Sequence, residues 1–415
     1  MKCGLLGRKL GHSYSPQIHA QLADYSYELF EKEPEELEDF LKNGDWSGIN
    51  VTVPYKKTVI PYLDELTPLA RKLGAVNTIV RRDGKLIGHN TDYFGFQKLA
   101  ETLPIPIFGH KALVLGSGGA SNTAAAVLED MGAQVVVISR SGENNYENLH
   151  LHKDARLIVN TTPVGMYPNT GKAPVDVKDR KKFPCLRGVL DVVYNPARTQ
   201  LLLDAETLDD GDDWFHYRNG LLMLVAQAKE AAEWFTGTKI SDDVIKPILD
   251  HLEYRMLNII LIGMPGCGKS TIGKLLSEKT GRKFVDADEE IVRMAGKSIP
   301  EIFAQDGEDV FRDWETKVLA ELGKQSGLII ATGGGCVTKE RNYPLLHQNG
   351  EIFWIRRKID DLPTDGRPLS QKNSLAEMYK IREPLYQQWN DWFIDNYDTP
   401  EYAVWQIMNV MEYET

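Results

Sequence analysis

The stretch Leu257-Asn-Ile-Ile-Leu-Ile-Gly-Met-Pro-Gly-Cys-Gly-Lys-Ser-Thr271 decides the fold of the last third of the chain. Its apolar run leads into Gly263-x-x-x-x-Gly268-Lys269-Ser270, and a helix-compatible run begins at Ile272. This spacing is typical of a phosphate-binding loop, whose backbone N–H groups point into a concavity at a helix N-terminus. The sequence therefore predicts a strand, a phosphate-binding loop and a helix that open a parallel sheet.

A nucleoside triphosphate is the predicted ligand of this loop. Lysine in such loops reaches the β and γ phosphates, and the hydroxyl after it binds Mg²⁺, which assigns these roles to Lys269 and Ser270. The predicted cofactor-binding residues are Gly263, Gly266, Gly268, Lys269, Ser270 and Thr271.

Downstream, the run Phe284-Val-Asp286-Ala-Asp288 predicts a strand that ends in two carboxylates. Alternation along a strand would place both on the side that faces the phosphate loop. One carboxylate can position Mg²⁺ through water, and the other can take the proton from an attacking hydroxyl. An equally open alternative is that Asp288 only caps the helix that follows.

Arginines and a triple glycine follow in order along the chain: Arg312, Gly333-Gly334-Gly335, Gly366-Arg367-Pro368-Leu369 and Arg382-Glu383-Pro384. Adjacent glycines let the backbone approach a ligand, and arginine can fork onto a carboxylate or a phosphate. Each arginine alone is more simply a surface charge. With the phosphate loop, in this order, the motifs resemble shikimate kinase across residues 257 to 415.

This resemblance implies phosphoryl transfer from ATP to the 3-hydroxyl of shikimate, with Asp288 as the base and Asp286 helping to hold Mg²⁺. The implied catalytic residues are Asp288, Lys269 and Arg367, the last reaching the transferring phosphate from a lid. The implied substrate contacts are Asp288, Arg312, Gly334, Gly335 and Arg382. The lid is short for the family, and Asp360 stands where an adenine-packing arginine is usual. Arg356 and Arg357 are the two candidates to replace that arginine.

A second glycine cluster, Gly116-Ser-Gly118-Gly119-Ala120, follows the apolar run that ends at Leu115 and is a variant of the dinucleotide fingerprint. After the next strand, Ser139-Arg140-Ser141 stands where an acidic residue would select NAD. A guanidinium between two hydroxyls suits a 2′-phosphate, so the predicted cofactor is NADP(H). The alternative is that Arg140 is only a surface residue at a strand end. The predicted contacts are Gly116, Gly118, Gly119, Ala120, Ser139, Arg140 and Ser141.

Motifs before and after this cluster resemble shikimate dehydrogenase over residues 2 to about 253. They are Gly11-His-Ser-Tyr-Ser-Pro16, Asn50-Val-Thr-Val-Pro-Tyr-Lys56, Gly74-Ala-Val-Asn-Thr78, Gly88-His-Asn-Thr-Asp92, Asn160-Thr-Thr-Pro-Val-Gly-Met166, Asp191-Val-Val-Tyr-Asn-Pro196 and Gly220-x-x-Met223-x-x-x-Gln227. Singly, the first four are only turn and cap signals.

Family resemblance implies that Lys56 and Asp92 form the catalytic pair at the carbonyl that is reduced. A lysine ammonium there can stabilise the charge that develops on oxygen and deliver the proton. The implied substrate contacts are Ser13, Ser15, Thr52, Asn77, Tyr194 and Gln227. Gly220 and Met223 would lie beside the nicotinamide.

Length and composition are consistent with a chain that contains more than one folded domain. The 415 residues predict two or three folding units, and the net charge of −11 disfavours a surface for nucleic acid or an anionic membrane. Four cysteines without a C-x-x-C pair, no long apolar run and no signal-like start predict a cytoplasmic protein. The expected partners are small molecules, and the sequence does not predict an oligomeric state.

The predicted fold class is α/β: a substrate lobe, 1–101; a Rossmann-like NADP domain, 102–235; a helix and short linker, 236–256; and a nucleoside-monophosphate-kinase-like P-loop domain, 257–415. The predicted function is reduction of 3-dehydroshikimate with NADPH followed by phosphorylation of shikimate with ATP and Mg²⁺, two consecutive steps towards aromatic amino acids. Two alternatives remain open: a kinase-like half that only binds or scaffolds, and a dehydrogenase that acts on quinate, against which Ser13 and Ser15 weigh only weakly.

Overall fold

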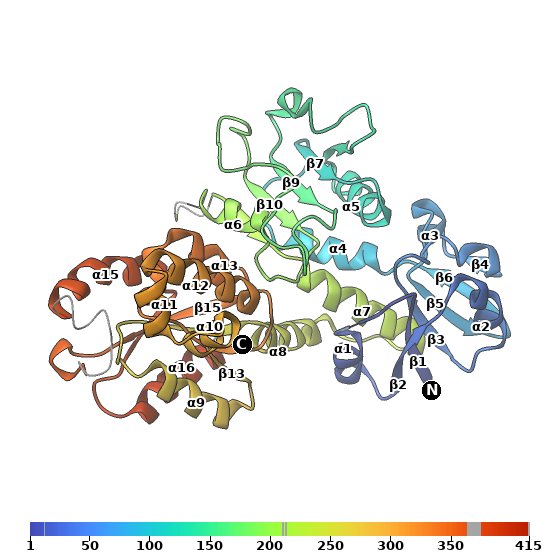
Figure 1. Cartoon of the computed structure of the whole chain (residues 1–415). Helices are drawn as coiled ribbons and strands as arrows, with labels where there is room; N and C mark the ends of the chain where they lie inside the picture. The colour runs from blue at the N-terminus through green and yellow to red at the C-terminus, as the bar shows by residue number, and fades with distance from the viewer. Residues whose placement is uncertain (12, 210, 212–213, 363–374, 414–415) are drawn as a thin grey trace. The chain divides into compact units, whose positions relative to one another are not determined.

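The computed structural model describes residues 1–11, 13–209, 211, 214–362 and 375–413 (Figure 1). The chain divides into two compact units. The first comprises Met1–Val164, Ala173–Tyr194 and Asp204–Leu249, and the second comprises Gly165–Lys172, Asn195–Leu203 and Asp250–Thr415. The described residues form three sheets, two in the first unit and one in the second.

The first sheet has six strands in the order β2-β1-β3-β5-β6-β4. Strand β5 pairs antiparallel with β3 and β6, and the other neighbours are parallel. Apolar side chains of β1, β3 and β5, such as Leu6, Ile49 and Ile79, are buried and form a core with α2. The elements are β1 Lys2–Gly7, α1 Ser15–Leu22, β2 Ser26–Glu31, α2 Leu37–Asn43, β3 Gly48–Val51, β4 Glu65–Leu66, α3 Pro68–Leu73, β5 Thr78–Arg82 and β6 Lys85–His89.

The second sheet has five strands in the order β11-β10-β9-β7-β8, and every neighbouring pair is parallel. Its central strands are buried except at Lys111, the first residue of β7, which explains their nearly continuous apolar sequence. The elements are α4 Asp92–Glu101, β7 Lys111–Leu115, α5 Gly119–Asp130, β8 Gln134–Ile138, β9 Leu157–Asn160, β10 Gly188–Asp191, α6 Gln200–Glu206, β11 His216–Arg218 and α7 Leu221–Thr236.

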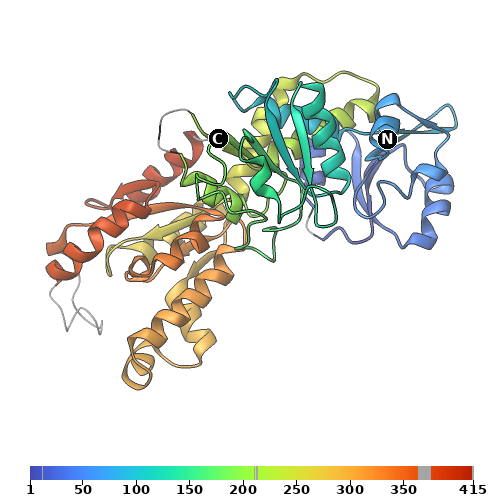
Figure 2. The same ribbon diagram turned by 90° about the horizontal axis from the view of Figure 1, so that it is seen from above.

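The third sheet is also five-stranded and parallel, in the order β13-β14-β12-β15-β16. Helices α12 and α13 lie on one face of this sheet and α9 and α16 on the other (Figures 1 and 2). The elements are α8 Ile245–Met256, β12 Asn258–Ile262, α9 Lys269–Thr280, β13 Phe284–Asp286, α10 Ala287–Ala295, α11 Ile299–Gln305, α12 Glu308–Gly323, β14 Ile329–Ala331, α13 Tyr343–His347, β15 Gly350–Arg356, α15 Leu375–Trp389, β16 Trp392–Asp395 and α16 Pro400–Tyr413.

The predicted α/β class is confirmed, and so are the parallel sheets that open at the two glycine clusters. One local prediction is wrong. Strand β13 ends at Asp286, and the Asp286 carboxylate accepts a hydrogen bond from the Asp288 backbone N at 3.0 Å. Asp286 therefore caps α10, and Asp288 lies in its first turn, so strand alternation is not what brings the two carboxylates to one side.

None of the helices in the described part of the chain combines the length and the apolar character that a membrane-spanning helix needs.

Candidate active sites

A cavity of about 350 Å³ opens in the first unit, where loops from its two sheets meet helix α7. Strand ends, a helix start and the loop after β10 all contribute side chains, which is the usual placement of binding groups in α/β folds. Its lining residues are Leu5, Lys9, Leu10, Ser13, Ser15, Asn50, Val51, Thr52, Lys56, Asn77, Asp92, Ala120, Val192, Tyr194, Gly220, Met223, Leu224 and Gln227.

Lys56 and Asp92 form an ion pair inside this cavity. The Lys56 Nζ lies 2.6 Å from Asp92 Oδ2, and the two side chains are only 26% and 12% exposed. Asp92 is the first residue of α4, where the helix dipole favours a carboxylate. Its other oxygen, Oδ1, accepts a hydrogen bond from Asn77 Nδ2 at 2.9 Å. The lysine is thereby held towards the cavity by a carboxylate that is itself fixed.

All six predicted substrate contacts of this unit line the same cavity. Asn77 and Gln227, which come from different elements, are joined through Thr91. The Thr91 backbone N donates to Asn77 Oδ1 at 2.7 Å, and the Thr91 hydroxyl donates to Gln227 Oε1 at 3.4 Å. Thr91 is fully buried, and no sequence pattern distinguishes it from its neighbours in the Asn-Thr-Asp turn.

The glycine cluster after β7 has the geometry of an anion-binding turn. Gly116 has a φ of +117°, and a Cβ there would lie 2.8 Å from the Thr161 hydroxyl. A Cβ at Gly118 or Gly119 would meet no other atom within 4 Å, so the backbone at the start of α5 is open to a ligand. No side chain caps α5, which leaves its first N–H groups available for a diphosphate. These features fit a dinucleotide.

Predicted cofactor contacts divide into two groups. Ala120, Gly220 and Met223 line the cavity. A Cβ at Gly220 would lie 2.1 Å from the Val192 carbonyl oxygen, so only glycine fits that turn. Gly116, Gly118, Gly119 and the run Ser139-Arg140-Ser141 lie outside its lining, with the serine–arginine run directly after β8.

Sequence reasoning missed several lining residues of this cavity, and Lys9 is the charged one among them. Its only sequence signal is its place, four residues before Ser13 in a segment already assigned to substrate binding.

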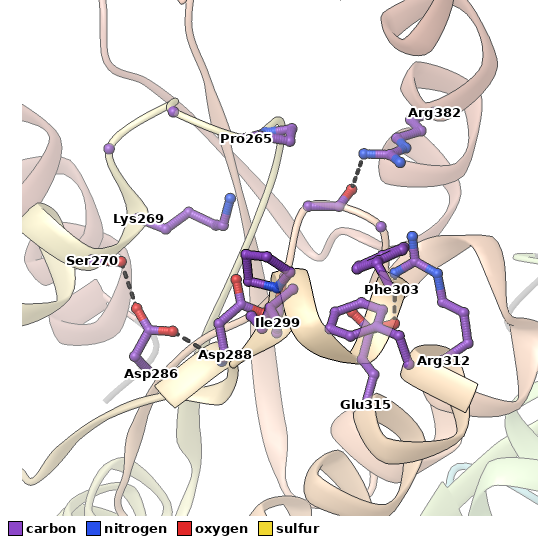
Figure 3. Close-up of a pocket in the computed structure, with 18 of the residues that line it drawn as sticks. Pro265, Lys269, Ser270, Asp286, Asp288, Ile299, Phe303, Arg312, Glu315 and Arg382 are labelled. Carbon is purple, nitrogen blue, oxygen red and sulfur yellow. Dashed lines mark hydrogen bonds and ion pairs between the residues drawn. The ribbon is translucent and has the colours of Figure 1, made fainter. Parts of the chain in front are cut away.

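The second cavity, of about 570 Å³, lies in the second unit at the carboxyl ends of the parallel strands. Figure 3 shows the Lys269 side chain above Asp286 and Asp288, with Arg312 and Arg382 on the other side of the pocket. Its lining residues are Pro265, Gly266, Gly268, Lys269, Ser270, Thr271, Asp286, Asp288, Ile299, Pro300, Phe303, Phe311, Arg312, Glu315, Thr332, Gly333, Gly334, Gly335, Arg357 and Arg382.

The Lys269 side chain folds back onto the phosphate-binding loop and binds two of its carbonyl oxygens. Lys269 is buried, and its Nζ donates to the carbonyl oxygens of Gly263 and Met264 at 2.9 and 3.0 Å. Gly263 has a φ of +141°, and a Cβ there would lie 2.5 Å from the Ile355 carbonyl oxygen. The loop therefore needs glycine at this position to let the backbone turn beside β15.

Ser270 and Asp286 supply oxygen ligands that fit Mg²⁺. The Ser270 hydroxyl donates to Asp286 Oδ2 at 2.6 Å, so the two predicted metal residues are adjacent (Figure 3). Hydroxyl and carboxylate oxygens are the donors that Mg²⁺ prefers, usually with phosphate and water completing its shell. Asp288, the predicted base, lines the same cavity from the first turn of α10.

Arg312 and Arg382 meet around the triple glycine. Arg312 is buried, and its Nη1 donates to Glu315 Oε2 at 2.9 Å. A Cβ at Gly335 would lie 2.3 Å from Arg312 Nη2, so glycine is required for the guanidinium to lie there. Arg382 Nη1 donates to the Gly334 carbonyl oxygen at 3.0 Å. Two guanidinium groups thus converge on one end of the cavity, where they suit an anionic group.

Glu315 lines this cavity, and sequence reasoning missed it. Its side chain is fully buried, and burial raises its pKa to about 7 although Arg312 opposes the shift. The spacing of three residues from Arg312 on an amphipathic helix was its only signal.

Of the arginines predicted to act from the lid, only Arg356 and Arg357 lie within the described residues. Arg367 lies outside the described residues. Arg356 pairs with Asp395 at 2.7 Å and lies over the Phe393 ring, whereas Arg357 lines the cavity. Of the two candidates that replace the missing lid arginine, Arg357 is the one that faces the site.

Comparison with known protein families gives two matches in one chain. Residues 5–79 match the model of the shikimate dehydrogenase substrate binding domain, and residues 265–412 match the model of shikimate kinase.

Individual relatives with similar sequences or structures match about the first 60% of the chain. The chain is 38% identical over 275 residues to a shikimate dehydrogenase (NADP(+)) of Clostridium perfringens, which covers 61% of this chain and 98% of that protein. The crystal structure of shikimate dehydrogenase 1 from Peptoclostridium difficile is 36% identical, with a TM-score of 0.53, over 61% of this chain and 97% of that one. A chorismate mutase/shikimate 5-dehydrogenase fusion protein from Clostridium acetobutylicum is 34% identical, with a TM-score of 0.55, over 60% and 96%.

Proposed function

The chain belongs to the shikimate dehydrogenase family and carries a shikimate kinase domain after the dehydrogenase part, and from this premise we propose how one polypeptide performs both reactions. It is a bifunctional enzyme that reduces 3-dehydroshikimate with NADPH and phosphorylates shikimate with ATP. One observation carries the proposal: two separate cavities, each lined by its own set of reactive groups.

The reduction takes place in the first cavity. NADPH, when bound, supplies the hydride. As negative charge develops on the substrate oxygen, the Lys56 ammonium stabilises it and delivers a proton. Asp92 keeps Lys56 in place through the 2.6 Å ion pair, and Asn77 orients Asp92 in turn. Ser13, Ser15, Thr52, Tyr194 and Gln227 are the remaining substrate contacts.

Phosphoryl transfer takes place in the second cavity. Lys269 and the N–H groups of the loop hold the phosphates, and Ser270 with Asp286 would hold Mg²⁺, which neutralises phosphate charge when bound. Asp288 accepts the proton of the attacking hydroxyl. Arg312 and Arg382 hold the substrate carboxylate, since both guanidinium groups lie against the triple glycine, Arg312 beside Gly335 and Arg382 on the Gly334 carbonyl oxygen. Arg357 covers the nucleotide.

Its other properties follow from this chemistry. The partners are small molecules, and we place the enzyme in the cytoplasm, where NADPH and ATP are available and its four free cysteines stay reduced. The boundaries at residues 101, 235 and 256 remain our proposed domain limits.

A single assay tests the proposal. The full chain receives 3-dehydroshikimate, NADPH, ATP and Mg²⁺, and loss of NADPH and formation of ADP are followed together. Lys56→Ala should abolish NADPH oxidation and leave phosphorylation of added shikimate intact. Asp288→Asn should do the reverse. NADPH loss without ADP would reduce the second unit to a binding module, and loss of both activities from either change would contradict independent sites.

A further inference from the structure

Lys9 is a cationic residue of the first cavity lining that has no role in the proposed reduction. The charged residues that line this cavity are Lys9, Lys56 and Asp92. Lys56 and Asp92 neutralise each other at 2.6 Å. Within the described ranges of the chain Lys9 makes no ion pair, so among the charged residues that line the cavity it is the one without an opposite charge beside it.

Two hydrogen bonds of the backbone hold the chain around Lys9. The Leu10 backbone N donates to Glu31 Oε1 at 2.7 Å, and the Lys32 backbone N donates to the Gly7 carbonyl oxygen at 3.0 Å. These two contacts fix the turn that follows β1, so the fold itself places Lys9 at the cavity.

Two hydroxyls lie close to Lys9 in the chain and line the same cavity. The Ser13 oxygen accepts a hydrogen bond from the Ser15 backbone N at 3.2 Å, which leaves its own hydrogen available for an acceptor in the cavity. Neutral hydroxyls can orient a carboxylate but cannot balance its charge. A substrate that is a monoanion needs a cation, and Lys56 is already paired with Asp92.

We propose that Lys9 is the cationic contact for the substrate carboxylate and that it makes this site specific for carboxylated rings. This inference rests on the proposed reduction of 3-dehydroshikimate. Lysine at an exposed rim attracts an anion at longer range than a hydroxyl, and salt screens that attraction. Lys9 therefore contributes to substrate binding and capture and takes no part in the proton transfer at Lys56.

Kinetics of three variants test this role: Lys9→Met, Lys9→Arg and Lys9→Glu. We expect Lys9→Met to raise the KM for 3-dehydroshikimate about 3- to 5-fold, the upper part of the range for one exposed charge pair, with kcat and the KM for NADPH unchanged. Lys9→Arg should restore most of the affinity, and Lys9→Glu should weaken it further. The salt dependence of kcat/KM should be smaller in Lys9→Met than in the unaltered enzyme.

Arg8→Met is the matched control, because it removes the neighbouring cation, whose partner Glu33 lies outside the cavity lining. It should leave the KM for 3-dehydroshikimate within twofold of the unaltered value. Kinase activity of each preparation, measured with added shikimate, reports the amount of intact chain, and thermal unfolding reports whether the first unit is folded.

Inhibition of NADPH oxidation by shikimate and by its methyl ester separates charge from shape, because this readout reports binding in the first cavity alone. Lys9→Met should weaken shikimate binding and leave binding of the uncharged ester unchanged. Equal losses for both ligands, or a KM that does not respond to Lys9→Met, would overturn the role of Lys9. If instead the unaltered chain oxidises no NADPH with 3-dehydroshikimate, the proposed function itself has failed.

Discussion

Gly95 offers a direct test of how the first cavity is assembled. It lies in α4, one turn after Asp92, and helix α7 crosses it there. A Cβ at Gly95 would lie 2.6 Å from the Met223 carbonyl oxygen and 2.9 Å from Gln227 Cβ. Met223 and Gln227 are the proposed cofactor and substrate contacts of α7, so the absence of a side chain at position 95 sets their distance from Asp92.

The expected size of the effect follows from these contacts. Ordinary contact begins at 3.4 Å, so Gly95→Ala must move α7 away from α4 by about 0.8 Å at Met223. Overpacking of this kind costs about 1–3 kcal/mol, and alanine returns about 1 kcal/mol through its higher helix propensity. A net loss of about 2 kcal/mol or less leaves a domain of ordinary stability folded. Displacement of a binding group by nearly 1 Å should still lower kcat/KM for reduction by about 10- to 100-fold.

Gly48→Ala is the control for this experiment. A Cβ at Gly48 would lie 2.3 Å from Phe235 Cδ1, so it also crowds α7, but two turns beyond Gln227 and against a side chain. The assay compares kcat/KM for 3-dehydroshikimate in both variants at a temperature where thermal unfolding shows both to be folded, with kinase activity as internal reference. Gly95→Ala activity within threefold of Gly48→Ala would refute the reasoning.

Further predictions concern the cofactors and pH. Because burial raises the pKa of Glu315 to about 7, Glu315 is protonated below that pH and ionised above it, where it competes with the substrate carboxylate for Arg312. The KM for shikimate in the kinase reaction should rise between pH 6 and pH 8, and Glu315→Gln should flatten that rise; an unchanged pH profile would contradict it. Asp286→Asn should raise the Mg²⁺ concentration needed for half-maximal phosphorylation about tenfold or more, whereas EDTA should stop phosphorylation and leave NADPH oxidation intact. Arg140→Ala should raise the KM for NADPH about 10-fold or more with little change for NADH, and equal effects on both would assign Arg140 no contact with the 2′-phosphate.

The Lys56–Asp92 pair shows how far sequence reasoning reaches. The two residues are 36 positions apart, and only the family resemblance joined them; the structure then places them 2.6 Å apart. The sequence correctly predicted that Asp286 and Asp288 lie on the same side, near the phosphate loop. It attributed this to strand alternation, whereas the strand ends at Asp286 and a helix begins there.

By itself, the sequence determined the strand–loop–helix units at both glycine clusters, the parallel sheets and the chemistry of their ligands. These features depend on local patterns: an apolar run, a glycine where φ is positive, and a polar group at a strand end. Tertiary structure alone decided that Arg357 faces the second cavity, that Glu315 is fully buried beside Gly333, and that Lys9 lines the first cavity. Each of these depends on contacts between segments distant in sequence, which no local pattern encodes, because burial and partner are set only when the elements pack.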